Sequence, residues 1–321
     1  MNKKLLITGG AGFIGSNFVH YILQNHPDYD IIVLDKLTYA GNLNNLKAVT
    51  DKIKFIRGDI CNTKDVEMAM EGVDFVVSFA AETHVDRSIS GAKEFVMTEV
   101  FGANTLLEVV NRFGTKKFVL VSTDEVYGEI EKGSFNETDP LHPRNPYAAT
   151  KAGADLLALS FFETYGLPVM ITRTTNNFGP YQHPEKFIPR ALTSVMSGKP
   201  IQIYGDGKQI RDWIFVKDNC AAIDTVLQKG NVGEVYNICA KNEKTNIEIA
   251  TKVLQLLGKP VDSLKFVPDR PGHDKRYSLD PSKIHALGWT CKETFDSGMK
   301  NTVDWYKENE WWWKPLIENM G

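Results

Sequence analysis

The 321-residue sequence contains only four cysteines. They stand far apart and form no C-x-x-C pair, which argues against a zinc site and against a disulfide framework. We therefore expect packing residues that remain thiols in a reducing compartment, and no metal site. The four are Cys61, Cys220, Cys239 and Cys291.

The sequence also lacks a strong charge of either sign and any long hydrophobic run. Lys and Arg number 37 against 40 Asp and Glu, for a net charge of −3. This balance gives no electrostatic reason to expect nucleic acid or a membrane surface as a partner. No apolar run approaches the ~20 residues of a membrane-spanning helix, and no export signal precedes the first glycines. We expect a cytoplasmic protein with a small-molecule ligand.

Short apolar segments alternate with segments of helical periodicity through the first half of the chain. This alternation is typical of an α/β protein with a parallel, doubly wound sheet of the Rossmann type. The expected strands are 4–8, 31–35, 54–57, 74–79, 117–122 and 169–172, and the expected helices are 13–25, 63–71, 93–112 and 147–164.

The pattern changes after about residue 175, where prolines and a glycine-rich turn break the chain into shorter pieces. We expect a dinucleotide-binding domain over 1–175 and a smaller C-terminal substrate-binding lobe over 176–321. A segment near 213–238 is expected to return to the first domain. Later helices fit 217–228, 246–257, 281–287 and 293–308, and the tryptophans at 311–313 are expected to be packed or to face another subunit.

Three evenly spaced glycines, Gly9, Gly12 and Gly15, follow the first expected strand. Without side chains they permit a sharp turn, a close approach of backbone to a pyrophosphate and close packing of the next helix. The N–H groups that begin this helix then face the phosphates. The spacing differs from the common G-x-G-x-x-G fingerprint, so a purely structural turn is the alternative.

The second expected strand ends at Asp35. A carboxylate at this place accepts the ribose hydroxyls of NAD and repels the 2′-phosphate of NADP. Lys36 is the only base close by in the sequence. The pattern therefore favours NAD.

Tyr147 and Lys151 are four residues apart on the expected helix 147–164, so they share one face. A lysine ammonium favours the phenolate form of a tyrosine, which can then take a proton from an alcohol. The same spacing recurs at Tyr204 and Lys208, but a glycine-rich turn separates that pair. We therefore assign the chemistry to the first pair.

The expected strand 117–122 delivers Thr123, Asp124 and Glu125 to the carboxyl edge of the sheet. Two adjacent acids beside a tyrosine can act as an acid and a base if their environments separate their pKa values. The alternative is a solvated acidic strand end or a cap for the next segment.

Seven segments together closely resemble the dTDP-glucose 4,6-dehydratases, which belong to the extended short-chain dehydrogenase/reductase family. The resemblance covers nearly the whole chain and implies an NAD-binding Rossmann domain, a nucleotide-sugar lobe and a homodimer built on helices like 93–112 and 147–164. The segments are TGGAGFIG (8–15), AAETHVDRS (80–88), STDEVYG (122–128), YAATK (147–151), NNFGPY (176–181), GDGKQIRDW (205–213) and RPGHDKRY (270–277).

The resemblance implies a catalytic role for five residues. Tyr147 would be the base for the sugar 4-hydroxyl, Lys151 its electrostatic support and a ribose ligand, and Thr123 a hydrogen-bond partner of O4. Asp124 would protonate the departing 6-hydroxyl and Glu125 would remove the C5 proton. The reaction oxidises C4, eliminates water across C5 and C6 and returns the hydride to C6, in deoxysugar synthesis of the dTDP-rhamnose type. Because NAD is regenerated in each cycle, we expect it to stay tightly bound.

The resemblance also assigns the ligand contacts. The expected cofactor residues are Gly9, Gly12, Phe13, Ile14, Gly15, Asp35, Lys36, Thr38, Asp59, Ile60, Ala80, Ala81, Tyr147 and Lys151. The expected substrate residues are His84, Ser88, Thr123, Asn177, Lys186, Phe187, Arg211, Asn246, Arg270 and Tyr277. For each single substrate residue the alternative is an ordinary surface charge or cap, and for His84 a satisfied core histidine.

The sequence departs from the family pattern at Glu99, Ala103, Phe178 and Asn219. Glu99 matters most, because it replaces an asparagine that helps shape the helix behind the catalytic tyrosine in relatives. Two other functions remain open: a nucleotide-sugar 4-epimerase or decarboxylase, which has no need of the acid pair, and a catalytically silent NAD-binding regulator. The sequence does not decide between thymine and uracil, which differ by one methyl group.

Overall fold

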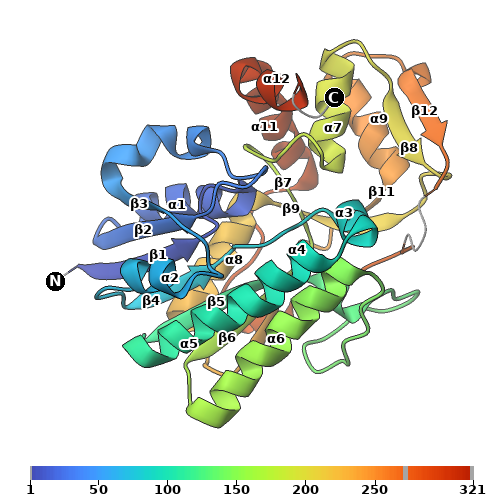
Figure 1. Cartoon of the computed structure of the whole chain (residues 1–321). Helices are drawn as coiled ribbons and strands as arrows, with labels where there is room; N and C mark the ends of the chain where they lie inside the picture. Colours follow the sequence, from blue (N-terminus) through green and yellow to red (C-terminus); the bar gives the residue numbers. More distant parts are fainter. Residues whose placement is uncertain (1, 270–273, 319–321) are drawn as a thin grey trace.

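A seven-stranded parallel sheet forms the centre of the larger part of the molecule, as Figure 1 shows. The computed structural model describes residues 2–269 and 274–318. In the sheet order β10-β6-β5-β4-β1-β2-β3, the direction of winding reverses between β1 and β4. This doubly wound order confirms the predicted fold class and places a ligand crevice beyond the carboxyl ends of these strands. The strands are β1 (Lys3–Thr8), β2 (Tyr29–Asp35), β3 (Ile53–Arg57), β4 (Phe75–Ser78), β5 (Lys117–Thr123), β6 (Val169–Thr174) and β10 (Val235–Ile238).

Helices cover both faces of this sheet because its strands are apolar on both sides. In β1, Leu5 and Ile7 pack in the cluster that contains α1 (Phe13–Asn25) and α8 (Val216–Lys229). Leu6, which points the other way, packs with residues of the opposite helical layer. That layer consists of α2 (Thr63–Ala69), α5 (Ala103–Phe113) and α6 (Pro146–Tyr165).

The helix predicted over 93–112 is present but not uniform. It consists of α4 (Lys93–Phe95), a π-helical segment η2 (Val96–Gly102) and α5. A Cβ atom on Gly102 would lie 2.7 Å from Cδ1 of Ile60, so glycine lets the helix approach that side chain. The π-helical segment contains the buried Glu99, and such segments often occur at functional sites.

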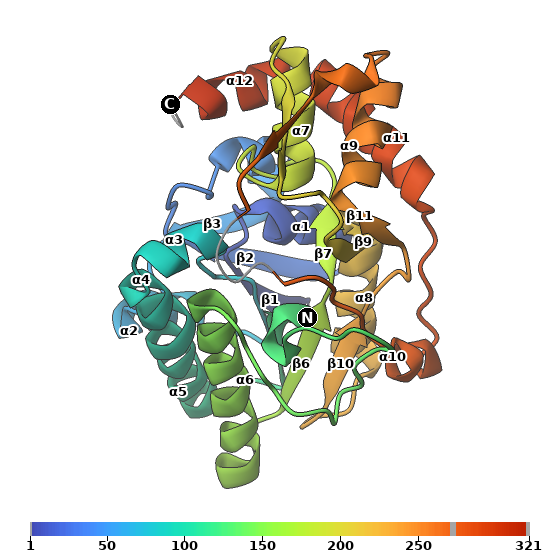
Figure 2. The same cartoon turned by 90° about the vertical axis from the view of Figure 1, so that its right-hand side faces the viewer.

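The C-terminal lobe contains two small sheets, of order β11-β9-β7 and β12-β8, with helices packed against them (Figure 2). The chain returns to the large sheet through α8 and β10, while the boundary at residue 175 stays a prediction. The lobe's elements are β7 (Asn176–Phe178), α7 (Phe187–Met196), β8 (Ile201–Tyr204), β9 (Ile210–Phe215), β11 (Glu243–Thr245), α9 (Asn246–Leu256), η4 (Val261–Ser263), β12 (Leu264–Val267), α11 (Phe295–Glu308) and α12 (Glu310–Glu318). The short helix α10 (Ser282–Ala286) packs instead beside β10 of the large sheet (Figure 2).

The last helix, α12, was not predicted as a helix. Two of its tryptophans, Trp312 and Trp313, are buried, whereas Trp311 is 53% exposed. The tail is therefore packed, as one of the two sequence-based alternatives proposed. None of the helices in the described ranges is both long and apolar enough to cross a membrane.

Candidate active site

A cavity of about 470 Å³ lies where the large sheet meets the C-terminal lobe. Residues at or just after the carboxyl ends of five strands line it: Gly9, Asp35, Ala80, Thr123 and Thr174. The lobe closes the cavity with residues of α7, β8 and β9. This is the position that the sheet topology requires for a ligand.

The glycine turn fits a dinucleotide. Gly9 has a φ of +68°, which favours glycine, and a Cβ atom on Gly15 would lie 2.3 Å from the Gly9 carbonyl oxygen. Gly12 is the N-cap of α1 and has no side chain to cap the helix. The first N–H groups of α1 therefore remain available to phosphate oxygens.

Asp35 is buried at the end of β2 and held by two backbone donors. Its Oδ2 accepts the N–H of Ala11 at 2.9 Å, and its Oδ1 accepts the N–H of Leu37 at 2.8 Å. Burial raises the pKa of this carboxyl, and the two hydrogen bonds act in the opposite direction. Nearby, the Lys36 ammonium lies 2.7 Å from Oδ2 of Asp59. A fixed acid and a base engaged by another carboxylate suit the ribose hydroxyls of NAD better than the phosphate of NADP.

All the expected cofactor residues line this one cavity, from the glycine turn to Lys151. Asp59 and Ile60 follow β3, and Ala80 and Ala81 follow β4. The arrangement therefore brings together every position that the sequence predicted for the cofactor.

Tyr147 and Lys151 lie in the first turns of α6, which begins at Pro146 with Asn145 as its N-cap. The Lys151 ammonium donates to the carbonyl oxygen of Val121 at 2.8 Å. Burial, followed by the negative charges of Glu125 and Glu99, raises the pKa of Tyr147 well above 10. Tyr147 therefore needs cationic support before it can act as a base.

The Thr123 hydroxyl connects the two acids at the end of β5. It lies 3.2 Å from Oδ1 of Asp124 and accepts the N–H of Glu125 at 3.3 Å. Asp124 is 3% exposed, and burial and the neighbouring Glu125 raise its pKa to about 8. The Asn145 amide donates to Oε2 of Glu125 at 3.1 Å. Asp124 is thus a neutral acid near pH 7, next to a carboxylate that accepts hydrogen bonds.

Most of the expected substrate residues also line the cavity. Those present in the lining are His84, Thr123, Asn177, Lys186, Phe187, Arg211, Asn246 and Tyr277. Arg270 lies outside the described residues. Oδ1 of Asn177 is buried and has no hydrogen-bond partner among the described residues, so it is an acceptor available to a ligand.

His84 combines the two alternatives considered for it. It caps α3 (Val85–Ser90), because its Nδ1 accepts the N–H of Arg87 at 3.4 Å. Its Nε2 lies 3.7 Å from Oε2 of Glu185, and the ring also lines the cavity. Burial lowers its pKa.

Ser88 requires a correction, because it does not line the cavity. The side chain is 1% exposed, donates to the Val85 carbonyl oxygen and accepts the backbone N–H of Tyr147 at 3.2 Å. Both hydrogen bonds of this hydroxyl are made within the protein, one to α3 and one to the start of α6. The serine therefore ties α3 to the start of α6, and the structure does not place it among the residues that line the cavity.

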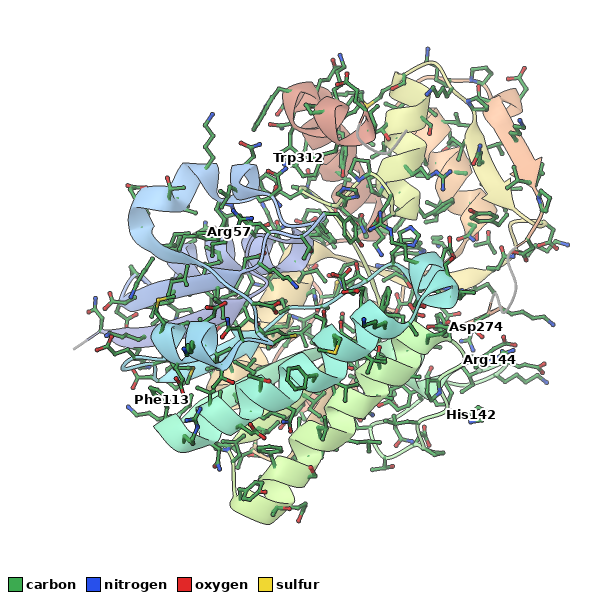
Figure 3. The ribbon with its side chains drawn as sticks, in the orientation of Figure 1. Arg57, Phe113, His142, Arg144, Asp274 and Trp312 are labelled. Atoms are coloured by element: carbon green, nitrogen blue, oxygen red, sulfur yellow. The ribbon has the colours of Figure 1, made fainter. Side chains whose placement is uncertain are left out.

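Arg211 contacts the segment 274–277. Its guanidinium donates to the Asp274 carbonyl oxygen at 2.8 Å and stacks on the Tyr277 ring at 4.3 Å. Arg144 contacts the Asp274 side chain at 2.9 Å, and Figure 3 shows these two residues side by side. The tyrosine hydroxyl donates to the same carboxylate. These contacts fix Tyr277 against the cavity.

Several lining residues were missed by the sequence analysis: Glu185, Arg190, Gln202, Tyr204 and Trp213. The carboxylate of Glu185 is buried and accepts the hydroxyl of Tyr39 at 2.9 Å. Arg190 donates to the Gln202 side chain at 3.0 Å. Tyr204 was set aside as the second Tyr-Lys pair, yet its ring lines the lobe side of the cavity.

Comparisons with known proteins agree with this geometry. The model of a family described as GDP-mannose 4,6 dehydratase matches residues 6–302. The chain is 51% identical to the low-salt glycan biosynthesis protein Agl12 of Haloferax volcanii, over 94% of this chain and 98% of the relative. It is 49% identical to the dTDP-glucose 4,6-dehydratase of Streptomyces niveus, over 98% and 95%.

Solved structures give the same result. The dTDP-glucose 4,6-dehydratase DesIV of Streptomyces venezuelae, crystallised with NAD, has a TM-score of 0.96 and 49% identity, covering 98% of this chain and 99% of its own. The UDP-glucose 4-epimerase of Thermus thermophilus, also with NAD, has a TM-score of 0.89 and 31% identity, covering 95% and 99%. The family expected from the sequence is confirmed: the chain belongs to the GDP-mannose 4,6 dehydratase family within the extended short-chain dehydrogenases/reductases.

Proposed function

We propose that this protein is an NAD-dependent dTDP-glucose 4,6-dehydratase, which forms dTDP-4-keto-6-deoxy-glucose and water. The observation that carries the proposal is the pair Asp124 and Glu125, placed in the same cavity as Tyr147. A neutral acid next to an ionised carboxylate is what an elimination of water requires. The curated relatives with this name support the choice of substrate.

In the first step of the proposed reaction, Tyr147 acts as the base. When bound, NAD supplies the two-electron acceptor that takes a hydride from C4 and later returns it to C6. Tyr147 takes the proton of the 4-hydroxyl, the ammonium of Lys151 stabilises the phenolate, and the hydroxyl of Thr123 holds O4.

The elimination uses the two acids. The ketone at C4 acidifies the C5 proton, which the carboxylate of Glu125 removes. Asp124 donates its proton to the departing 6-hydroxyl, and its raised pKa keeps that proton available at pH 7. When the hydride returns to C6, Glu125 gives a proton back to C5. Tyr147 then releases to solvent the proton it took from the 4-hydroxyl, and Asp124 takes one from solvent, so each residue returns to its initial state.

A 4-epimerase is the main alternative, because the two activities share this fold. Incubation with dTDP-glucose in deuterated water distinguishes them by NMR. The dehydratase gives a 4-keto-6-deoxy sugar with deuterium at C5, and the variant Glu125→Gln should lose this product. A product that keeps its 6-hydroxyl and differs only at C4 would refute the dehydratase.

The nucleotide is tested by turnover of dTDP-glucose, UDP-glucose and GDP-mannose under matched conditions. Thymine and uracil differ by a single methyl group, worth ~1–3 kcal/mol in a pocket, so the expected preference for dTDP-glucose over UDP-glucose is about 5- to 150-fold. Equal kcat/KM values for the two would contradict the assignment to dTDP-glucose.

We further propose that the protein is a homodimer that pairs through η2, α5 and α6. These helices lie side by side at one edge of the molecule (Figures 1 and 2). They expose large apolar side chains: Val96 at 46%, Phe101 at 48% and Leu156 at 60%. Light scattering should give twice the chain mass for the wild type and a monomer for Leu156→Asp. Val261→Asp, at a 58% exposed position in the other lobe, is the control that stays dimeric.

We place the protein in the cytoplasm, as a source of deoxysugar precursors of the dTDP-rhamnose type. All of its cysteines are free thiols, which suits a reducing compartment. Cell fractionation with an antibody against the chain tests the location.

A further inference from the structure

Glu99 is a buried acid directly behind the catalytic pair. It lies in η2 and is 2% exposed. Its Oε2 is 3.2 Å from the Lys151 ammonium, and its Oε1 accepts the backbone N–H of Glu82 at 2.8 Å. Both carboxylate oxygens are therefore directed at groups next to the cavity, although Glu99 itself does not line it.

The contact with Lys151 matters because that residue lies one helical turn after the predicted base on α6, on the same face of the helix. A buried carboxylate that pairs with an ammonium cancels much of its field at a third group. Glu99 therefore opposes the effect of Lys151 on Tyr147, and it contributes to the raised pKa of this tyrosine.

Other charges face the same region. Glu125 and Asp124 approach Tyr147 from the end of β5. Burial raises the pKa of Glu99, while the Lys151 ammonium and the N–H of Glu82 act in the opposite direction. The carboxylate of Glu82 faces Glu99 from the β4–α3 loop. Asp155 faces it from α6 and is itself paired with Arg173 at 2.9 Å. Of these acids, Glu99 is the one that contacts the Lys151 ammonium, so its effect on Tyr147 is separable by mutation.

We propose that Glu99 is a positioning residue for the dehydratase reaction: its carboxylate fixes the Lys151 ammonium against β5 and offsets its charge, so that Tyr147 keeps its proton until a cationic nicotinamide adds to the field. The inference rests on the proposed function for its catalytic consequence. The electrostatic arrangement itself does not depend on the identity of the substrate.

The variant Glu99→Gln separates charge from shape. Glutamine keeps the chain length and an oxygen for the N–H of Glu82, but it carries no charge. The charge of Lys151 then acts on Tyr147 without compensation, and the pKa of the tyrosine falls by roughly one unit. Glu94→Gln, at an exposed position on the same helix, is the matched control.

The direct measurement is a pH titration of tyrosinate absorbance in the NAD-bound protein, because the positive charge of the nicotinamide brings the titration of Tyr147 to lower pH. Subtracting the titration of each protein's Tyr147→Phe partner isolates Tyr147. The expected result is tyrosinate formation at lower pH in Glu99→Gln and an unchanged titration in Glu94→Gln. Superimposable wild-type and Glu99→Gln curves would overturn the proposal.

The second measurement is the pH profile of kcat with dTDP-glucose. Its acid limb should move to lower pH by roughly one unit in Glu99→Gln and stay in place in Glu94→Gln. If dTDP-glucose is not a substrate, only this measurement fails, and the titration still tests Glu99.

If Glu99→Gln does not fold, Glu99→Asp takes its place. The shorter side chain lengthens the ion pair with Lys151, so kcat falls and the acid limb of the pH profile moves in the same direction by less. An Asp variant with wild-type kcat and pH profile would contradict the proposal.

Discussion

Trp312 donates its indole N–H to the side-chain oxygen of Asn45 at 2.8 Å. The Asn45 amide in turn donates to the Ala11 carbonyl oxygen at 2.9 Å, and the Ala11 N–H donates to Asp35 at 2.9 Å. This chain of hydrogen bonds joins α12, on which Figure 3 labels Trp312, to the turn that is predicted to hold the cofactor. The C-terminal helix therefore helps to fix the cofactor-binding turn.

Trp312→Phe should loosen this turn. The substitution keeps an aromatic ring but leaves the buried Asn45 oxygen without its donor, at a cost of about 1–3 kcal/mol. We expect a melting temperature lower by about 2–6 °C and faster loss of NAD on gel filtration. Trp311→Phe, at the exposed neighbouring position, should change neither property. Equal NAD retention in the two variants would exclude a role for the Asn45 contact.

Gly15→Ala should strongly weaken cofactor binding. The added Cβ atom would lie 2.3 Å from the Gly9 carbonyl oxygen, and backbone cannot yield as a side chain can. We expect at least a 10-fold loss of NAD affinity by calorimetry, equivalent to about 1.4 kcal/mol. Gly91→Ala, where nothing lies within 4 Å of the new atom, is the control. Normal NAD affinity in Gly15→Ala would show that the turn opens at little cost.

Asp124→Asn should lower kcat by about 10²- to 10⁴-fold, because the asparagine has no acidic proton to give. The wild-type pKa near 8 also predicts a fall of kcat above about pH 8, as Asp124 ionises. The ordinary pKa of an aspartate is 3.8, so the folded protein binds the proton of Asp124 more tightly than the unfolded chain does. The resulting stabilisation is complete below pH 3.8 and is lost as the pH rises to 8.

Thermal unfolding between pH 4 and 8 checks the predicted contribution of Asp124 to the pH dependence of stability. The melting temperature should depend less on pH in Asp124→Asn than in the wild type. Asp262→Asn, at an exposed position, is the control. A variant that keeps the full wild-type dependence would show that Asp124 ionises normally.

The sequence was sufficient for the features that depend on neighbouring residues. Gly9 to Gly15 and Asp35 are recognisable because each follows directly on an apolar strand, and parallel strands bring their carboxyl ends to one edge. The same reasoning brought Thr123 and its two acids to the cavity. The residue types at strand ends can be read from the adjacent sequence, so these site residues can be predicted without knowledge of the tertiary structure.

The lobe side of the cavity was harder to predict. Gln202 and Tyr204 reach it because β8 pairs with β12, a contact between segments far apart in sequence. The π-helical winding around Glu99 has no pattern in the sequence, and the role of Ser88 depends on how α3 meets α6. The glycine-rich turn after Tyr204 correctly separated it from Lys208, but it gave no sign that the ring lines the cavity.

Ser88→Ala tests the corrected role of this serine. The change leaves the buried N–H of Tyr147 without an acceptor, so the start of α6 shifts and the base is misaligned. We expect the activation free energy to rise by about 1 kcal/mol, which corresponds to a roughly five-fold lower kcat. KM for dTDP-glucose should stay the same, because Ser88 does not line the cavity. Ser90→Ala, on the same short helix but exposed, should leave kcat unchanged. A raised KM with an unchanged kcat would instead support the original prediction that Ser88 contacts the substrate.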